Sequence, residues 1–283
     1  MAPGSWTPLF SGKPEPRAIR NVSAPLAPND VVLITGASSG IGEAIALHLA
    51  ARGCRLALAA RGAEELERVV AACRAAGGEA AAFPTDVADE ARCRAFVAGA
   101  LGAFGRVDAL VNNAGVTMEM RFEAMRDLAP VERIMRVNFL GAVYCTHAAL
   151  PHLRAARGRL AAVSSLTGLS GVPTRTAYAA SKHAVRGFFD SLRIELAGGG
   201  VSVTVAYPGF VATDIAARSF GERHVRDEHA MPAEECARRI VRAMDRRERE
   251  VVMTARGKVA RWLKLVAPGL VDRIAARAIE RGR

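Results

Sequence analysis

Tyr178 and Lys182, four residues apart, are the pair in this sequence best suited to acid–base chemistry. They fall in a segment, residues 176–196, that is predicted to be helical, and a spacing of four places both side chains on one helix face. An unperturbed tyrosine has a pKa of about 10 and exchanges protons poorly at neutral pH. A cation one turn away favours the phenolate, so we expect Lys182 to lower the pKa of Tyr178. Such a tyrosine could exchange a proton with a carbonyl or an alcohol.

Two further polar residues belong to the same hypothesis. Ser165 follows a predicted strand, where a hydroxyl can donate to a substrate oxygen, although the adjacent Ser164 could be mistaken for it. Asn138 falls inside a predicted helix, where asparagine is unfavourable by propensity. The alternative is a half-buried Tyr178 beside a solvated lysine. A serine hydrolase is the obvious rival, but the sequence has no Gly-x-Ser-x-Gly turn, and His183 is expected to line a groove or the surface.

The elements that must position these residues alternate between strand and helix. Strands are predicted at residues 31–34, 55–60, 80–83, 108–111, 159–164, 201–206 and 250–253, and helices near 40–52, 63–76, 90–104, 131–154, 176–196 and 233–245. This alternation predicts βαβ units, and hence one doubly wound α/β domain of the Rossmann type with a parallel sheet of about seven strands and helices on both faces. Ligands of such sheets bind at the carboxyl ends of the strands, where the candidate residues lie.

A glycine-rich loop, Thr35-Gly36-Ala37-Ser38-Ser39-Gly40-Ile41-Gly42, joins the first predicted strand to the first helix. Glycines permit tight turns, and a helix N-terminus presents free N–H groups to an anion. The flanking strand and helix are those that a dinucleotide-binding loop requires, although the spacing departs from the usual Gly-x-Gly-x-x-Gly.

With this loop, the sequence resembles the short-chain dehydrogenase/reductase family over about residues 30–253. The resemblance includes Asn112-Asn113-Ala114-Gly115, Asn138, Ser165, Tyr178-x-x-x-Lys182 and Pro208-Gly209 with Thr213, in order and at the family's spacings. Residues 176–196 look most like the branch of the 11-beta-hydroxysteroid dehydrogenases. The resemblance implies that Tyr178, Lys182, Ser165 and Asn138 are catalytic, with Ser165 thirteen residues before the tyrosine and Asn138 holding a water in a proton relay.

The resemblance also implies a nicotinamide cofactor and the residues that bind it. These are Gly36, Ser38, Ser39, Gly40, Ile41, Gly42, Arg61, Asp86, Val87, Asn112, Ala114, Gly115, Tyr178, Lys182, Pro208, Gly209, Val211 and Thr213. Asp86 and Val87 are expected to border the adenine, and Thr213 the nicotinamide carboxamide. The second strand ends in Ala60 and Arg61 rather than in an acidic residue, and an arginine suits a 2′-phosphate, so NADP(H) is expected to be preferred over NAD(H). The glycine-rich loop carries no second basic residue.

Charge and cysteine content limit the other functions. The chain has 39 basic and 28 acidic residues, a net charge of +11, and eight basic against two acidic residues lie from Arg256 to the end. No motif supports nucleic-acid binding. The apolar residues of this tail, Leu263, Val266, Leu270, Val271 and Ile274, share one face that is expected to pack on the domain or to lie on an anionic membrane. Five cysteines without a Cys-x-x-Cys spacing predict neither a disulfide framework nor a metal site.

The sequence therefore predicts three regions: an irregular or loosely docked proline-rich arm (1–29), a catalytic domain (30–254) with a substrate lid near 212–231, and a basic amphipathic extension (255–283). The expected activity is NADP(H)-dependent interconversion of a ketone and a secondary alcohol, on a lipophilic substrate. The alternative is a non-catalytic, membrane-associated NADP-binding sensor. No signal peptide or membrane-spanning segment is evident, so a cytoplasmic homodimer or homotetramer, with peripheral membrane contact as an option, is expected.

Overall fold

A seven-stranded parallel sheet forms the centre of the computed structural model, which describes residues 24–213, 215, 219–221 and 230–280. The strand order is β11-β7-β6-β4-β1-β2-β3. The strands are β1 (Val31–Thr35), β2 (Arg55–Ala60), β3 (Glu79–Pro84), β4 (Ala109–Asn112), β6 (Arg159–Val163), β7 (Ser202–Tyr207) and β11 (Glu250–Val252). The predicted α/β class and the seven strands are confirmed.

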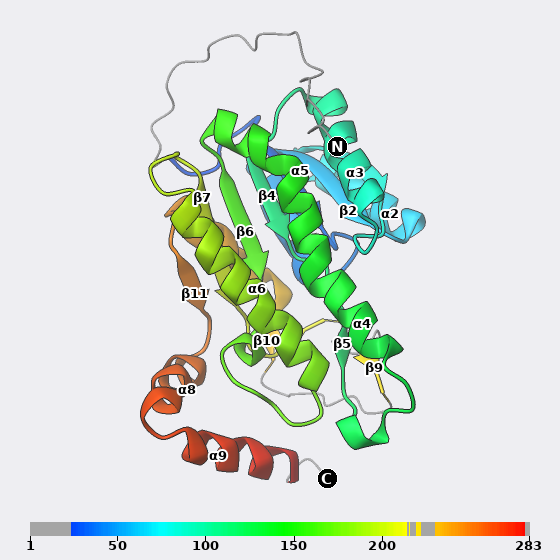
Figure 1. Cartoon of the computed structure of the whole chain (residues 1–283). Helices are drawn as coiled ribbons and strands as arrows, with labels where there is room; N and C mark the ends of the chain where they lie inside the picture. The colour runs from blue at the N-terminus through cyan, green and yellow to red at the C-terminus, as the bar shows by residue number, and fades with distance from the viewer. Residues whose placement is uncertain (1–23, 214, 216–218, 222–229, 281–283) are drawn as a thin grey trace, which may run out of the picture.

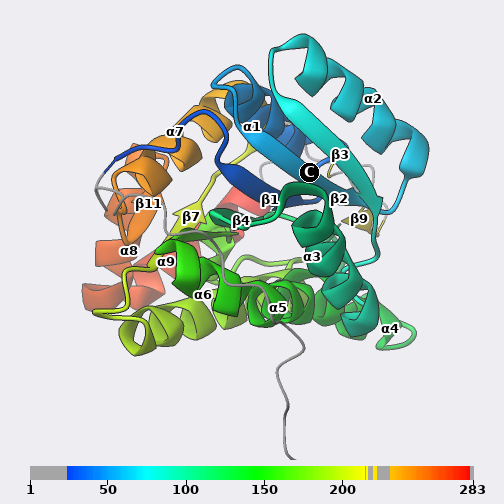
Figure 2. The same ribbon diagram turned by 90° about the horizontal axis from the view of Figure 1, so that it is seen from above.

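Helices cover both faces of this sheet (Figure 2). On one face lie α1 (Gly40–Ala50), α2 (Ala63–Ala75) and α7 (Ala233–Asp245), and on the other α3 (Glu90–Phe104), α5 (Gly141–Ala156) and α6 (Thr176–Glu195). The alternation of side chains along β1 explains this arrangement, because Val31 and Leu33 belong to one core cluster and Val32 and Ile34 to the other. All four are fully buried, as expected for a parallel strand covered on both sides.

Small elements that the sequence did not predict gather at the carboxyl end of the sheet, in the lower half of Figure 1. β5 (Thr117–Met118) pairs with β9 (Ser219–Phe220), and β8 (Val211–Ala212) pairs with β10 (Met231–Pro232). Two short 3₁₀ helices, η1 (Phe122–Ala124) and η3 (Leu166–Gly168), lie in the connections. Much of the lid expected near 212–231 lies outside the described residues.

The long helix expected at residues 131–154 is three successive segments. α4 (Ala129–Met135) leads into a π-helical turn, η2 (Arg136–Leu140), and then into α5. Asn138 lies in the middle of the π-helical turn. Such turns are rare and are found frequently at functional sites. The expectation of one regular helix around Asn138 was therefore wrong.

The described part of the N-terminal arm, residues 24–29, is irregular, as one reading of its prolines predicts, but it is bound firmly to the domain rather than loosely docked. Leu26 is buried, and its N–H donates to Oδ1 of Asp245 at 2.7 Å. Arg52 binds the same carboxylate and also the carbonyl of Leu26, and Arg159 donates to the carbonyl of Ala24. Residues 24–29 are thus held on the domain by hydrogen bonds from three distant parts of the chain. The rest of the proline-rich arm lies outside the described residues.

Two helices follow the last strand, α8 (Ala255–Val266) and α9 (Pro268–Glu280), and they break at Pro268 as expected. Only part of their apolar face packs on the domain. Val271 is buried, but Val266 is 81% exposed and Ile274 is 53% exposed. None of the helices in the described ranges is both long enough and apolar enough to span a membrane.

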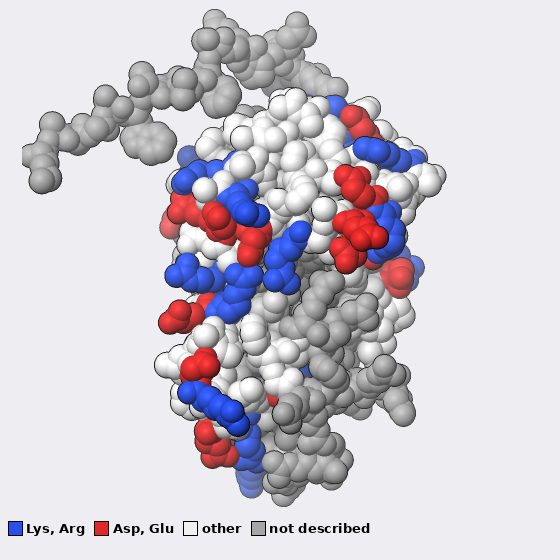
Figure 3. All heavy atoms as spheres, turned by 90° about the vertical axis from the view of Figure 1, so that its right-hand side faces the viewer, with Lys and Arg blue, Asp and Glu red and all other residues white. Residues whose placement is uncertain are grey.

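Charge is mixed on the face shown in Figure 3, where basic and acidic side chains alternate and no continuous basic surface forms. All five cysteines are buried and free.

Candidate active site

The glycine-rich loop turns from β1 into α1 with an N-terminus that no side chain caps. Ser39 is the N-cap residue, and its hydroxyl makes no capping hydrogen bond, so first-turn N–H groups remain available to an anion. Gly36 has φ of +66°, and a Cβ there would lie 2.8 Å from the Cα of Ala114. A Cβ on Gly40, at φ +58°, would lie 2.9 Å from the Thr213 side chain. The loop is therefore held between the Ala114 backbone and the Thr213 side chain, and it fits a dinucleotide phosphate.

Asn113 supports this loop, although the sequence analysis had selected its neighbour Asn112. The Asn113 side chain donates to the carbonyls of Thr35 and Gly36, each at 3.1 Å. Asn112 is buried, and its amide donates instead to Thr146 on α5 at 2.9 Å, so it does not line the cofactor pocket. Both asparagines belong to the motif that resembles the family, but only Asn112 was selected as a cofactor-binding residue, and the structure gives the contact with the loop to Asn113.

The four residues expected to be catalytic meet at the carboxyl end of β6. The Lys182 ammonium lies 5.7 Å from the centre of the Tyr178 ring and donates to the carbonyl of Val163 at 2.8 Å. Ser165 forms a side-chain hydrogen bond with Tyr178. Ser164 has a different partner, because its hydroxyl donates to the backbone carbonyl of Lys182 at 3.0 Å. Ser165, not Ser164, therefore faces the tyrosine.

Burial dominates the protonation of the tyrosine and the lysine. It raises the pKa of Tyr178, against the opposing effects of the Ser165 hydrogen bond and the charge of Arg175. Burial also lowers the pKa of Lys182 to about 8. Lys182 was expected to lower the pKa of the tyrosine, but in this structure it does not, because both groups share a low-dielectric site that disfavours either charge. Tyr178 is therefore a neutral phenol, a proton donor, at pH 7.

Asn138 closes the other side of this cluster. Its Oδ1 accepts from the N–H of Val116 at 2.8 Å, and its Nδ2 donates to the Val116 carbonyl at 2.9 Å and to Ser181 at 3.0 Å. Both amide hydrogens are thus used within the protein, and a second lone pair of Oδ1 remains. A Cβ on Gly115 would lie 3.3 Å from this Oδ1 and 3.7 Å from the Lys182 ammonium. The side chains of Asn138 and Lys182 therefore border the same small polar space beside Gly115.

Arg175 is a charged neighbour of the tyrosine that the sequence analysis did not select. It precedes α6 directly and donates to Thr117 on β5 at 3.1 Å. Its guanidinium also lies 3.6 Å from the carboxylate of Glu119 and 6.0 Å from the ring centre of Phe210. Arg175 thus connects the start of the helix that carries Tyr178 to two strand-end segments at the substrate end of the sheet.

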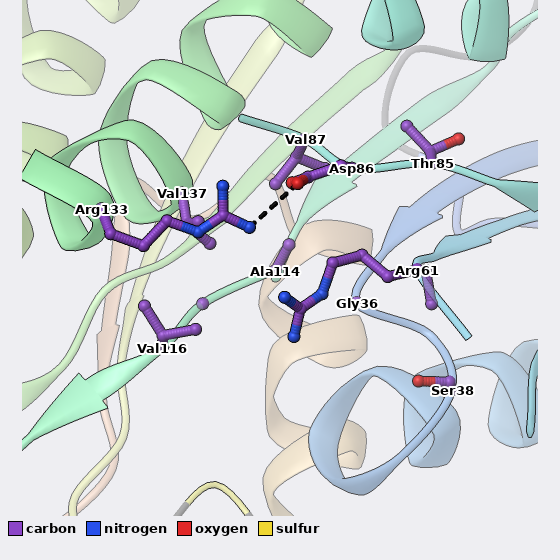
Figure 4. Close-up of a pocket in the computed structure, with 12 residues that line it drawn as sticks. Gly36, Ser38, Arg61, Thr85, Asp86, Val87, Ala114, Val116, Arg133 and Val137 are labelled. Carbon is purple, nitrogen blue, oxygen red and sulfur yellow. Dashed lines mark hydrogen bonds and ion pairs between the residues drawn. The ribbon is translucent and has the colours of Figure 1, made fainter. Parts of the chain in front are cut away.

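A pocket at the carboxyl ends of β1, β2, β3 and β4, beside α4, adjoins this cluster (Figure 4). It is lined by Gly36, Ser38, Ala60, Arg61, Thr85, Asp86, Val87, Ala114, Gly115, Val116, Arg133 and Val137. Seven of the residues expected to bind cofactor are among them: Gly36, Ser38, Arg61, Asp86, Val87, Ala114 and Gly115. Arg133 was missed, since nothing in the sequence relates a residue of α4 to this pocket.

The remaining expected residues surround the same end of the sheet. Pro208 accepts from the N–H of Leu166, next to Ser165, at 2.9 Å. A Cβ on Gly209 would lie 3.0 Å from Thr254. Val211 lies in β8, and Thr213 follows it. Ile41 and Gly42 belong to the first turn of α1. The glycine-rich turn, the uncapped helix and the basic and acidic residues of the pocket together fit a dinucleotide.

Comparison with known proteins agrees with a dinucleotide-binding site of this kind. A family model described as short chain dehydrogenase matches residues 30–224. The 11-beta-hydroxysteroid dehydrogenase-like 2 protein of Arabidopsis thaliana is 38% identical over 86% of this chain and 79% of its own, and the dehydrogenase/reductase SDR family protein 7-like of Drosophila melanogaster is 34% identical over 88% and 80%.

Solved structures are similar as well. A short chain dehydrogenase/reductase of Burkholderia phymatum in complex with NAD has a TM-score of 0.78 at 28% identity, over 86% of this chain and 95% of its own. The alcohol dehydrogenase of the archaeon Thermococcus sibiricus, complexed with 5-hydroxy-NADP, has a TM-score of 0.71 at 28% identity, over 78% and 94%.

Proposed function

The chain belongs to the short-chain dehydrogenase/reductase family, and on that premise we propose that it interconverts a ketone and a secondary alcohol with NADP(H) as its cofactor. It is an oxidoreductase with a fold that binds a nicotinamide cofactor. The observation that carries the finer proposal is the cluster of buried Tyr178, Lys182 and Asn138 with half-buried Ser165, beside the Arg61 pocket.

In this proposal Tyr178 exchanges the proton of the reacting oxygen. Its raised pKa keeps the phenol protonated at pH 7, which suits the reduction of a ketone. Ser165 donates its one hydroxyl hydrogen to Tyr178 in this structure, and with substrate bound it donates to the substrate oxygen instead and holds that oxygen within reach of the tyrosine. Lys182, with a pKa of about 8, can regenerate the tyrosine proton by way of the polar space that Asn138 borders. The cofactor, when bound, supplies or accepts the hydride.

The preference for NADP(H) rests on Arg61. This residue directly follows β2 and lines the pocket, and no acidic residue stands at the end of that strand to accept hydrogen bonds from a free 2′-hydroxyl. The planar, permanently charged guanidinium suits a phosphate. Two of the similar proteins are named as bound to NAD and to 5-hydroxy-NADP, respectively, so the family accepts both kinds of dinucleotide.

A lipophilic substrate is supported by apolar residues at the substrate end. Phe210 is 51% exposed and Ile215 is 40% exposed. Relatives named as 11-beta-hydroxysteroid dehydrogenases are consistent with this class of substrate.

The proposal is tested by following NADPH absorbance with a panel of steroids, long-chain ketones and 3-oxoacyl compounds. We expect at least one ketone to oxidise NADPH stoichiometrically and its alcohol to reduce NADP⁺. If NADPH binds but no carbonyl compound in the panel is reduced, the alternative of a non-catalytic NADP-binding sensor is favoured. The same assay run with NADH measures the cofactor preference.

A second property, peripheral contact with an anionic membrane, is proposed for α8 and α9. Trp262, Leu265 and Val266 are 66%, 72% and 81% exposed, an unusual concentration of exposed apolar side chains. Lys258, Arg261 and Lys264 lie on the same helix. An apolar face flanked by basic residues suits an anionic lipid surface.

Co-sedimentation with vesicles tests this property. We expect binding to vesicles that contain phosphatidylserine, weakened by salt and by Val266→Glu. Ile194→Glu is the matched control, because Ile194 is 74% exposed on α6. If Val266→Glu instead converts a dimer or tetramer into a monomer and vesicles do not bind, the face is a contact between subunits.

A further inference from the structure

Arg133 and Asp86 form an ion pair at the edge of the cofactor pocket. Arg133 lies on α4 and reaches across to the segment after β3, where its guanidinium is 2.9 Å from Oδ2 of Asp86. The other oxygen, Oδ1, accepts from the N–H of Ala88 at 3.0 Å. Both side chains are about one third exposed, 33% for Arg133 and 29% for Asp86, so the pair faces the open pocket.

Arg61 and Arg133 enter this pocket from opposite sides, with Asp86 at its rim beside Arg133 (Figure 4). Arg61 has no ion-pair partner among the described residues, so its charge is not neutralised there. Burial raises the pKa of Asp86, but the hydrogen bonds from Arg133 and Ala88, together with the charges of both arginines, outweigh burial and lower it. The three charges therefore act on one another, and their sum is one positive charge.

Resting on the proposed function, we propose that Arg133 is a second determinant of cofactor choice, which with Arg61 favours a dinucleotide that carries a 2′-phosphate. The two dinucleotides differ only in that group, and a phosphomonoester carries up to about two negative charges at pH 7. Any change in the charge of the pocket must therefore act more strongly on NADPH than on NADH. Arg133 supplies from α4 the second basic residue that the glycine-rich loop lacks.

Asp86 has the opposite effect to Arg133 on the affinity of the pocket for a 2′-phosphate. Its carboxylate cancels one of the two positive charges, so it weakens the attraction for a phosphate. Each of its oxygens already accepts one hydrogen bond, and because Asp86 lines the pocket a remaining lone pair can accept from an adenine amino group, which both dinucleotides possess. Loss of the Asp86 charge should therefore weaken the binding of both dinucleotides but shift the ratio of their affinities toward NADPH.

Dissociation constants for NADPH and NADH, measured by nucleotide fluorescence without turnover, test this inference. Arg133→Met should raise the dissociation constant for NADPH by about tenfold and that for NADH by less than about threefold. The reason is that the variant removes one positive charge, which acts on the doubly charged 2′-phosphate that only NADPH carries. Asp86→Asn should move the NADPH-to-NADH affinity ratio in the opposite direction. Arg136→Met is the matched control, because Arg136 is exposed three residues further along and does not line the pocket; its ratio should not change.

The outcomes separate this inference from the proposed function. Equal weakening of both dinucleotides by Arg133→Met would overturn the inference, because Arg133 would then act on the shared adenosine or only through Asp86. In that case wild-type binding of NADPH would leave the proposed function intact. If the wild-type protein bound neither dinucleotide, the proposed function would fail and the inference with it.

Discussion

Lys182→Met is predicted to stabilise the protein at pH 7 while removing its activity. Lys182 is buried, and its pKa is lowered from 10.5 to about 8. Below pH 8 the lysine is charged in both the folded and the unfolded state, so the full burial cost opposes folding. A shift of this size corresponds to about 3 kcal/mol. Methionine has a similar shape but no charge.

The variant also loses one hydrogen bond. The Lys182 ammonium donates to the Val163 carbonyl at 2.8 Å, and leaving that buried carbonyl unpaired costs about 1 kcal/mol. The expected net stabilisation at pH 7 is therefore about 2 kcal/mol. As pH rises from 8 to 10.5, the folded protein loses the lysine proton before the unfolded chain does, and the burial cost falls. At pH 9.5 it is about 1.5 kcal/mol, so the net gain of the variant should nearly disappear.

Urea unfolding of the wild-type protein and of Lys182→Met at pH 7.0 and pH 9.5 measures this difference, because other titrating groups cancel between the two proteins. Loss of catalysis with retained NADPH binding would show that the lysine is kept for function at a cost in stability. A variant that is less stable than the wild type by the same amount at both pH values would refute the reasoning, since burial of the charge would then carry no cost.

Three further predictions follow from the site. Arg61→Asp should shift the ratio of kcat/KM from NADPH toward NADH, and an unchanged ratio would show that Arg61 is only a surface charge. Gly36→Ala should abolish dinucleotide binding measured by fluorescence, because its Cβ would meet the Ala114 backbone at 2.8 Å with φ at +66°; near-normal binding would mean that the loop shifts freely. Arg175→Met should move the pH profile of alcohol oxidation to higher pH, because loss of this cation raises the pKa of Tyr178, and an unmoved profile would show that Arg175 acts only on packing.

The architecture followed from periodicity, whereas several features of the site did not. Val31 to Ile34 form a fully apolar run, and such a run between helical segments predicts a buried parallel strand. The π-helical turn at Asn138 has no comparable signal, since it depends on hydrogen bonds to Val116 and Ser181 that only the tertiary structure creates. The resemblance to the family therefore located Asn138 but not the backbone that presents it.

The sequence also could not predict which charged side chains meet across the pocket. Arg133 is 47 residues from Asp86, and the pair exists only because α4 and the end of β3 meet at one edge of the sheet. The pKa of Tyr178 was misjudged for a similar reason. The spacing to Lys182 was visible in the sequence, but the depth of burial, which outweighs it, was not.

The central claim is that the phenolic oxygen of Tyr178 exchanges the proton, while the phosphate loop and the Arg61 pocket supply most of the affinity for the cofactor. Tyr178→Phe removes only the phenolic oxygen, so NADPH turnover with the best ketone of the panel should fall by at least about a hundredfold. The dissociation constant for NADPH should change by less than about threefold, because the phosphate loop and the Arg61 pocket are untouched. Retention of more than about a tenth of the wild-type kcat, with NADPH still bound, would contradict this assignment.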